Sequence, residues 1–213
     1  MRKLFLALAI AMLPFSASAQ DVSAAPDQPA PAQPAAEPAA PQPAGPLATI
    51  QTSMGSFVIA LDPVHAPLTV ANFIRYAKAK HFDGTVIYRI APNFVIQMGS
   101  YDAKGNYRPT RKPIPLEANN GLSNVRGAVA MARDDPPASA VAEFFIDMSD
   151  NSAALDHDPK DTGNTTGYAV FGHVVSGMAV LDKINDVPLG GTGPMPASAP
   201  KTPITIEKIT IAP

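Results

Sequence analysis

The stretch TVIYRIAPNFVIQMG, residues 85–99, predicts two apolar strands joined by a turn that contains Pro92. Each strand carries one strongly polar residue, Arg89 in the first and Gln97 in the second. A guanidinium on an apolar surface is costly unless a partner offsets its desolvation. The pair indicates either a site that binds a polar group, or an Arg89 that reaches solvent or pairs with an acid such as Glu143. The spacing leaves both interpretations open.

Side chains alternate along a strand, so we expect Ile87 and Arg89 to share one face, and likewise Val95 and Gln97. A site built here would combine a fixed positive fork, an amide and apolar walls. Such a combination suits a neutral amide ligand that carries an apolar ring.

The same alternation applies to EFFI, residues 143–146, where Phe144 and Phe145 face opposite sides. One of these rings can therefore belong to the core while the other lines a surface groove.

Residues 1–19 have the three parts of a secretory signal peptide: the charged Arg2 and Lys3, an apolar run, and a small-residue cleavage site after Ala19. The apolar run is too short to span a bilayer before Pro14 interrupts it. We therefore expect an exported, periplasmic protein with no membrane span in the mature chain.

Two regions follow the signal. Residues 20–46 are dominated by Pro and Ala, a composition that favours a disordered, extended linker. Residues 47–213 are long enough for one domain with a full core.

Composition excludes several classes of protein. The chain has 16 Lys and Arg against 18 Asp and Glu and contains no Cys. It offers no basic cluster for nucleic acid, no disulfide and no thiol nucleophile. The four histidines are far apart in the sequence, so we expect no metal and no cofactor.

The remaining pattern predicts many strands and two helices. Helical periodicity covers 65–84 and 177–186, and a final strand alternates through 203–213. A mainly antiparallel sheet closed by helices, in the form of a barrel, fits this order.

Four blocks carry a resemblance to a known family: VIYRIAPNFVIQMGS (86–100), PLEANNGLSNVRGAVAMAR (115–133), AEFFIDMSDN (142–151) and GYAVFGHVVSGMAVLDKI (167–184). The chain resembles the cyclophilin-type peptidyl-prolyl cis-trans isomerases, most closely their exported bacterial members, from about Ala48 to Ile211. The resemblance implies a mainly β fold, a closed eight-stranded antiparallel β-barrel capped by two α-helices, with a proline groove on its outer surface. It also implies a monomer that assists folding of exported polypeptides by rotating their Xaa-Pro bonds.

The resemblance assigns the site residue by residue. It implies that Arg89 and Gln97 are catalytic. It implies that substrate is bound by Phe94, Val95, Ala132, Arg133, Glu143, Phe145, Leu155 and Tyr168. Six positions depart from the family's pattern, with the usual residue in brackets: Tyr88 (His), Asn93 (Gly), Val95 (Met), Met98 (Gly), Glu143 (Gln) and Ala154 (Trp or Phe).

In the mechanism that the resemblance implies, Arg89 donates a hydrogen bond to the prolyl nitrogen as the peptide bond twists. No group in that scheme titrates near neutrality, so we expect a rate nearly constant from about pH 6 to pH 8. A bell-shaped profile would indicate Glu143 or a histidine.

Two other kinds of protein remain possible from the sequence. One is a non-catalytic proline-peptide-binding or chaperone module of the envelope, whose turnover was lost through Glu143 and Val95. The other is a structural envelope protein held by its Ala/Pro linker. An isomerisation assay on a short Xaa-Pro peptide separates the enzyme from both.

Overall fold

A computed structural model describes residues 45–160 and 166–213. The predicted signal peptide, 1–19, and nearly all of the predicted linker, 20–46, lie outside these residues. Among the described residues, none of the helices combines the length and apolar character that crossing a membrane requires.

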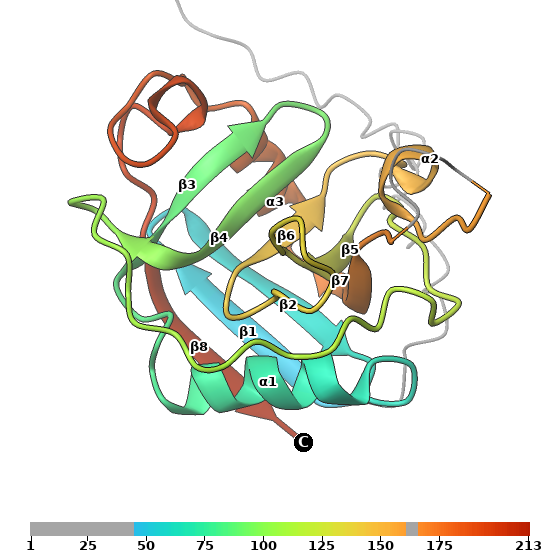
Figure 1. Ribbon diagram of the computed structural model, residues 1–213. Helices are drawn as coiled ribbons and strands as arrows, with labels where there is room; N and C mark the ends of the chain where they lie inside the picture. The colour runs from blue at the N-terminus through green and yellow to red at the C-terminus, as the bar shows by residue number, and fades with distance from the viewer. Residues whose placement is uncertain (1–44, 161–165) are drawn as a thin grey trace, which may run out of the picture. The chain divides into compact units, whose positions relative to one another are not determined.

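Eight antiparallel strands form one curled sheet, as predicted (Figure 1). Their order across the sheet is β3-β4-β6-β5-β7-β2-β1-β8. The strands are β1 (Leu47–Thr52), β2 (Gly55–Leu61), β3 (Thr85–Ala91), β4 (Val95–Asp102), β5 (Ala128–Met131), β6 (Phe144–Asp147), β7 (Ala169–Ser176) and β8 (Ile206–Ala212).

Complete closure of the barrel is not confirmed. The two edge strands of the sheet, β3 and β8, approach each other at one place, where Val86 forms an isolated bridge with Thr205. Beside it, Ile87 N donates to Ile204 O at 2.9 Å. Within the described part of the chain, no continuous ladder joins β3 to β8. The sheet is therefore a curled, open one.

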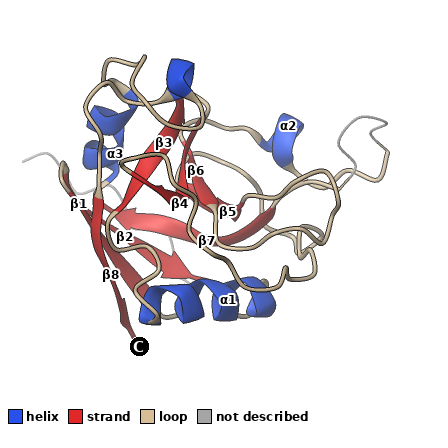
Figure 2. Ribbon diagram, turned by 60° about the vertical axis from the view of Figure 1, so that its left-hand side comes forward, coloured by secondary structure: helices blue, strands red, loops and turns tan. Residues whose placement is uncertain are grey.

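The two predicted helices are present, as α1 (Pro67–Lys78) and α3 (Met178–Asn185). They lie at opposite ends of the curled sheet (Figure 2). Two short elements were not predicted: α2 (Ser152–Leu155) and the 3-10 turn η1 (Pro196–Ser198). Four residues are too few to show helical periodicity in a sequence.

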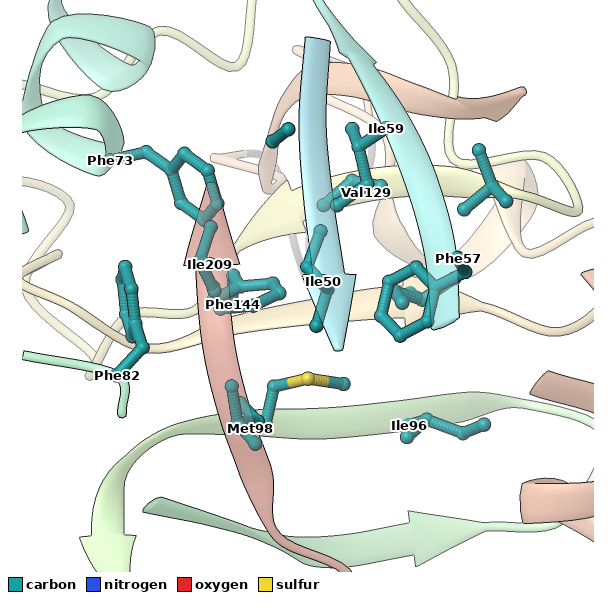
Figure 3. Close-up of a cluster of buried hydrophobic side chains, with 14 of the residues drawn as sticks. Ile50, Phe57, Ile59, Phe73, Phe82, Ile96, Met98, Val129, Phe144 and Ile209 are labelled. Carbon is teal, nitrogen blue, oxygen red and sulfur yellow. The ribbon is translucent and has the colours of Figure 1, made fainter. Parts of the chain in front are cut away.

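The inner face of the sheet carries the main hydrophobic core (Figure 3). Phe73 of α1 packs there edge-on against Phe144 of β6, with ring centroids 5.3 Å apart. Met98 is fully buried in the same core. Its place in the core accounts for this departure from the family's pattern, because the side chain fills space inside the sheet, away from the groove.

The outer face carries a second, smaller cluster. Its buried members are Val95, Ala128, Ala130, Phe145, Leu155 and Val170. Phe144 lies in the inner core and Phe145 in this outer cluster, so the predicted split of the two rings is confirmed. The apolar outer surface is where a ligand groove can form.

A β-bulge changes the expected facing of β3. Ile87 pairs with Met98 and Arg89 with Gln97. Two residues of β3 therefore lie opposite one residue of β4, which is the definition of a β-bulge. Ile87 consequently packs in the inner core, whereas Arg89 lies on the outer side. The prediction that these two residues share a face is wrong, because the extra residue, Tyr88, reverses the alternation between them.

The start of α1 is capped from a distant part of the chain. The residue before the helix, Ala66, has no side chain that can cap it. Instead the Glu117 carboxylate accepts hydrogen bonds from the backbone N–H groups of Leu68 and Thr69, at 3.1 and 2.8 Å. A carboxylate here satisfies orphan donors and complements the helix dipole.

We therefore expect Glu117→Ala to lower the free energy of unfolding by about 1–2 kcal/mol, the usual effect of losing a helix cap. Denaturant titration measures this change. Glu207→Ala, which removes an exposed carboxylate from β8, is the control and should stay within about 0.5 kcal/mol of the parent protein. Equal values for the two variants would contradict the capping role.

Candidate active site

The site begins as one row of residues across five neighbouring strands. Arg89 pairs with Gln97, Gln97 with Phe145, Phe145 with Ala130, and Ala130 with Val170. Directly opposed residues project from the same face of a sheet. The register therefore places a cation, an amide and an aromatic ring side by side on the outer surface.

A cavity of about 140 Å³ opens over this row. Its lining comprises Arg89, Phe94, Val95, Gln97, Ala132, Arg133, Phe145, Leu155 and Tyr168. These are nine of the ten site residues that the sequence predicted. A cavity of about 150 Å³ can hold a benzene molecule, so this one has room for a single small ring.

The walls of the cavity come from three different segments. Phe94 follows a turn in which Asn93 adopts a positive φ of 57°, a conformation that Asn tolerates better than most residues. Leu155 comes from α2, and Tyr168 precedes β7. The Tyr168 ring meets Phe145 edge-on at 5.5 Å. These segments give the cavity apolar walls, while Arg89, Gln97 and Arg133 form the polar part of its lining.

Arg89 sits half-exposed at the polar edge of the cavity. Its Nη1 donates a 3.0 Å hydrogen bond to Gln97 Oε1. Among the described residues it forms no ion pair, so the alternative in which Glu143 neutralises it is not what the structure shows. The remaining N–H groups of the guanidinium can reach a ligand in the cavity.

Glu143 contacts Arg89 only through Gln97. Its Oε2 accepts a hydrogen bond from the Tyr88 hydroxyl at 2.7 Å and a longer one from Gln97 Nε2 at 3.4 Å. Its Oε1 is buried and has no partner among the described residues. Burial raises the pKa of Glu143, and the hydrogen bonds from Tyr88 and Gln97 offset this only in part. The acid thus anchors the amide that orients the cation.

Arg133 lies in the wall of the cavity and contacts Tyr168. Its guanidinium carbon lies 4.8 Å from the centre of the Tyr168 ring, a cation–π distance. Its Nε donates to Gly167 O at 2.9 Å. These contacts hold Tyr168 at the edge of the cavity.

Ala132 can offer a ligand only one backbone group. Its N–H donates to Glu143 O at 2.9 Å, so the carbonyl is the group left for a bound peptide.

Ala154, at the position where the family's pattern has an aromatic residue, is exposed beside Leu155. Its methyl group adds little wall on that side of the cavity.

A second cavity of about 410 Å³ adjoins the first and shares Gln97, Ala132 and Arg133 with it. Its further lining residues are Tyr101, Tyr107, Asp134, Ser139, Val141 and Glu143. Glu143, the tenth predicted site residue, therefore lies in this cavity and not in the first. The sequence analysis missed Tyr101 and Tyr107. Two aromatic residues flanking an otherwise polar stretch, 101–107, were the available signal.

Comparison with known proteins identifies the family of the chain. Residues 47–211 match the family described as cyclophilin type peptidyl-prolyl cis-trans isomerase/CLD. The chain is 41% identical over 162 residues to peptidyl-prolyl cis-trans isomerase A of Dickeya dadantii, covering 76% of this chain and 82% of that one. It is 39% identical over 166 residues to peptidyl-prolyl cis-trans isomerase B of Escherichia coli, covering 78% and 99%.

A solved structure shares the fold. It is a Cryptosporidium parvum cyclophilin type peptidyl-prolyl cis-trans isomerase crystallised in the presence of the dipeptide Ala-Pro, with a TM-score of 0.63 and 20% identity. The similarity covers 78% of this chain and 99% of that one. Because the family match spans almost all of the described domain, the chain belongs to the cyclophilin-type peptidyl-prolyl cis-trans isomerases.

Proposed function

We propose that this isomerase acts on Xaa-Pro bonds of exported polypeptides, with the prolyl ring in the 140 Å³ cavity and Arg89 beside its nitrogen. One observation carries the proposal. A permanently charged, half-exposed guanidinium lies at the edge of a cavity with aromatic and aliphatic walls. It is oriented by an amide and has no salt bridge among the described residues. This arrangement leaves donors available to a neutral ligand.

The chemistry needs neither a nucleophile nor a metal. Rotation about a peptide bond faces a barrier of ~18–20 kcal/mol, because amide resonance is lost on twisting. In the twisted state the prolyl nitrogen becomes pyramidal and regains its lone pair. Arg89 can donate a stronger hydrogen bond to that nitrogen than to the planar amide, so it stabilises the transition state more than the ground state.

The size of this effect can be bounded. A hydrogen bond that involves a charged group contributes roughly 1.5–3 kcal/mol. Since each 1.36 kcal/mol is tenfold in rate, Arg89 accounts for about ten- to a hundredfold. The rest of the acceleration must come from the apolar walls, which hold the ring and exclude water, and from Gln97 and the Ala132 carbonyl, which hold the flanking peptide.

The cellular setting rests on the first 19 residues, whose charged start, apolar run and small-residue site are those of an export signal. We propose that the mature protein begins after Ala19, resides in the periplasm and meets polypeptides there before they are fully folded. Cell fractionation with N-terminal sequencing of the mature protein tests this; a protein retained in the cytoplasm with Met1 intact would contradict it.

Turnover is tested with the full mature chain on short Xaa-Pro peptides, in an assay where a protease cleaves only the trans form. Accelerated conversion of the cis fraction supports the enzyme. Binding of the same peptide without acceleration would favour the non-catalytic proline-binding module instead.

We expect Arg89→Ala to lower kcat/KM by about ten- to a hundredfold, because one charge-assisted bond is lost in the transition state. The dissociation constant of a Pro peptide, measured by calorimetry, should change far less. Arg75→Ala, at an exposed position in the last turn of α1, is the control and should match the parent enzyme. Equal losses in turnover and binding would show that Arg89 only positions the peptide.

For Glu143→Gln, we expect kcat/KM to stay within about threefold of the parent value, a change below one kcal/mol. The amide oxygen can still accept from Tyr88 and Gln97. Glu143→Ala instead leaves two donors unpaired, at a cost of about 1–3 kcal/mol for each buried one, and should slow turnover by releasing Gln97.

The parent protein and Glu143→Gln should also differ in how their free energy of unfolding varies with pH. Because burial raises the pKa of Glu143, the folded parent protein holds its proton to higher pH than the unfolded chain does. Its stability is therefore greatest at low pH and declines as pH rises through the folded pKa. The stability advantage of Glu143→Gln should grow from pH 5 to pH 8 in denaturant titrations. A difference in the free energy of unfolding that stays constant over this pH range would contradict a raised pKa for Glu143.

A further inference from the structure

Asp147 lies one row behind the proposed proline pocket. It ends β6, directly opposite Val95 of β4, and is two residues from Phe145, so it shares their outer face. Its relative exposure is 0%, which makes it the one completely covered carboxyl among the described residues. A carboxyl group at such a position needs a partner.

Asn151 supplies that partner and reaches both walls of the pocket. Its Nδ2 donates to Asp147 Oδ1 at 2.7 Å and to the backbone carbonyl of Phe94 at 2.9 Å. Its own carbonyl accepts from the backbone N–H of Leu155, also at 2.9 Å, in the single turn of α2. One residue therefore contacts the segments that carry Phe94 and Leu155.

Neighbouring residues reinforce the same connection. Met148 N donates to Phe94 O at 2.8 Å. Ser149 Oγ lies 2.7 Å from Asn93 O and 2.8 Å from Asn151 Oδ1. Both atoms are acceptors, so the single hydroxyl proton is donated either to the β3–β4 turn or to the Asn151 amide. The segment 147–151 thus fastens the turn that presents Phe94.

We propose that Asp147 and Asn151 are positioning residues that set the width of the prolyl pocket by fixing Phe94 relative to Leu155. The inference rests on the proposed function, because it takes the ring to bind between these two side chains. Neither residue touches the cavity itself, so both act through the walls.

The charge on Asp147 bears on this positioning. Its Oδ2 is buried without a hydrogen-bond partner among the described residues. Burial raises the pKa of Asp147 to about 7, the Asn151 hydrogen bond lowers it, and the nearby carboxylates of Asp156 and Asp150 raise it. Arg126, two residues before β5, does not pair with Asp147, because its guanidinium is bound to Met148 O and to Asp182.

Ionisation consequently strains the segment 147–151. A buried carboxylate with one free oxygen is relieved only if it gains water or donors, which requires Asn151 or the end of β6 to move. Either movement shifts Phe94 or Leu155. Below pH 7 the neutral acid leaves the pocket in place; as pH rises through 7 the pocket loosens.

The test measures kcat and KM of the full mature protein on an Xaa-Pro peptide from pH 6 to pH 8.5. For the parent enzyme we expect KM to rise severalfold with a midpoint near 7, while kcat changes less. Asp147→Asn, which keeps the shape and the acceptor oxygen, should hold the low-pH KM throughout. Asp158→Asn, which removes an exposed carboxylate from the loop after α2, is the matched control and should behave like the parent.

Repeating the series with Glu143→Gln in each protein removes the other buried acid of the site. The Asp147 effect should persist in that background. The same KM profile for the parent and Asp147→Asn would overturn the inference. An Asn151→Ala protein that binds the peptide as tightly as the parent would also overturn it, provided that a cooperative thermal denaturation transition shows the variant to be folded.

Peptide affinity, measured by calorimetry over the same pH range, separates this inference from the proposed function. Absent turnover, combined with an affinity that falls near pH 7 in the parent but not in Asp147→Asn, would support the inference and reject catalysis. Absence of both turnover and binding would overturn both.

Discussion

The site depends on keeping a charged guanidinium on an otherwise apolar face of the sheet. The bulge at Tyr88 turns Arg89 outward, and Gln97 on the next strand fixes its direction through one 3.0 Å hydrogen bond. Without the bulge, alternation would place Arg89 on the side of Ile87, in the core, where an unpaired charge is prohibitive. The one extra residue in β3 therefore decides whether Arg89 faces the outer cavity or is buried unpaired in the core.

The two faces of the sheet have different roles: the inner face forms the core, and the outer face carries the row of residues under the cavity. Inner residues such as Phe144 and Met98 build a core that holds the strands in register. That register in turn aligns Gln97, Phe145 and Ala130 across the outer face. Because the row is built from backbone pairing, its geometry is rigid, whereas the walls from α2 and the β3–β4 turn need separate fastening.

The sequence predicted what depends on short-range pattern or on family resemblance. The antiparallel strands, the two long helices, and the opposite facing of Phe144 and Phe145 follow from periodicity. The bulge at Tyr88 was missed because alternation gives no sign of an inserted residue. The Tyr88 partner of Glu143 was missed for a different reason: the two residues are 55 positions apart in the chain, and only the folded register brings them together.

The sequence and the structure lead to different expectations for how the activity of the enzyme depends on pH. A mechanism that relies on Arg89 alone predicts a rate independent of pH near neutrality, because a guanidinium stays charged. That reasoning counts only groups that touch the substrate. A buried carboxyl behind a wall, such as Asp147, changes the shape of the pocket when it ionises, without ever exchanging a proton with the ligand. For an enzyme whose chemistry is rotation, pH dependence can therefore report on the fit of the pocket and not on a catalytic acid or base.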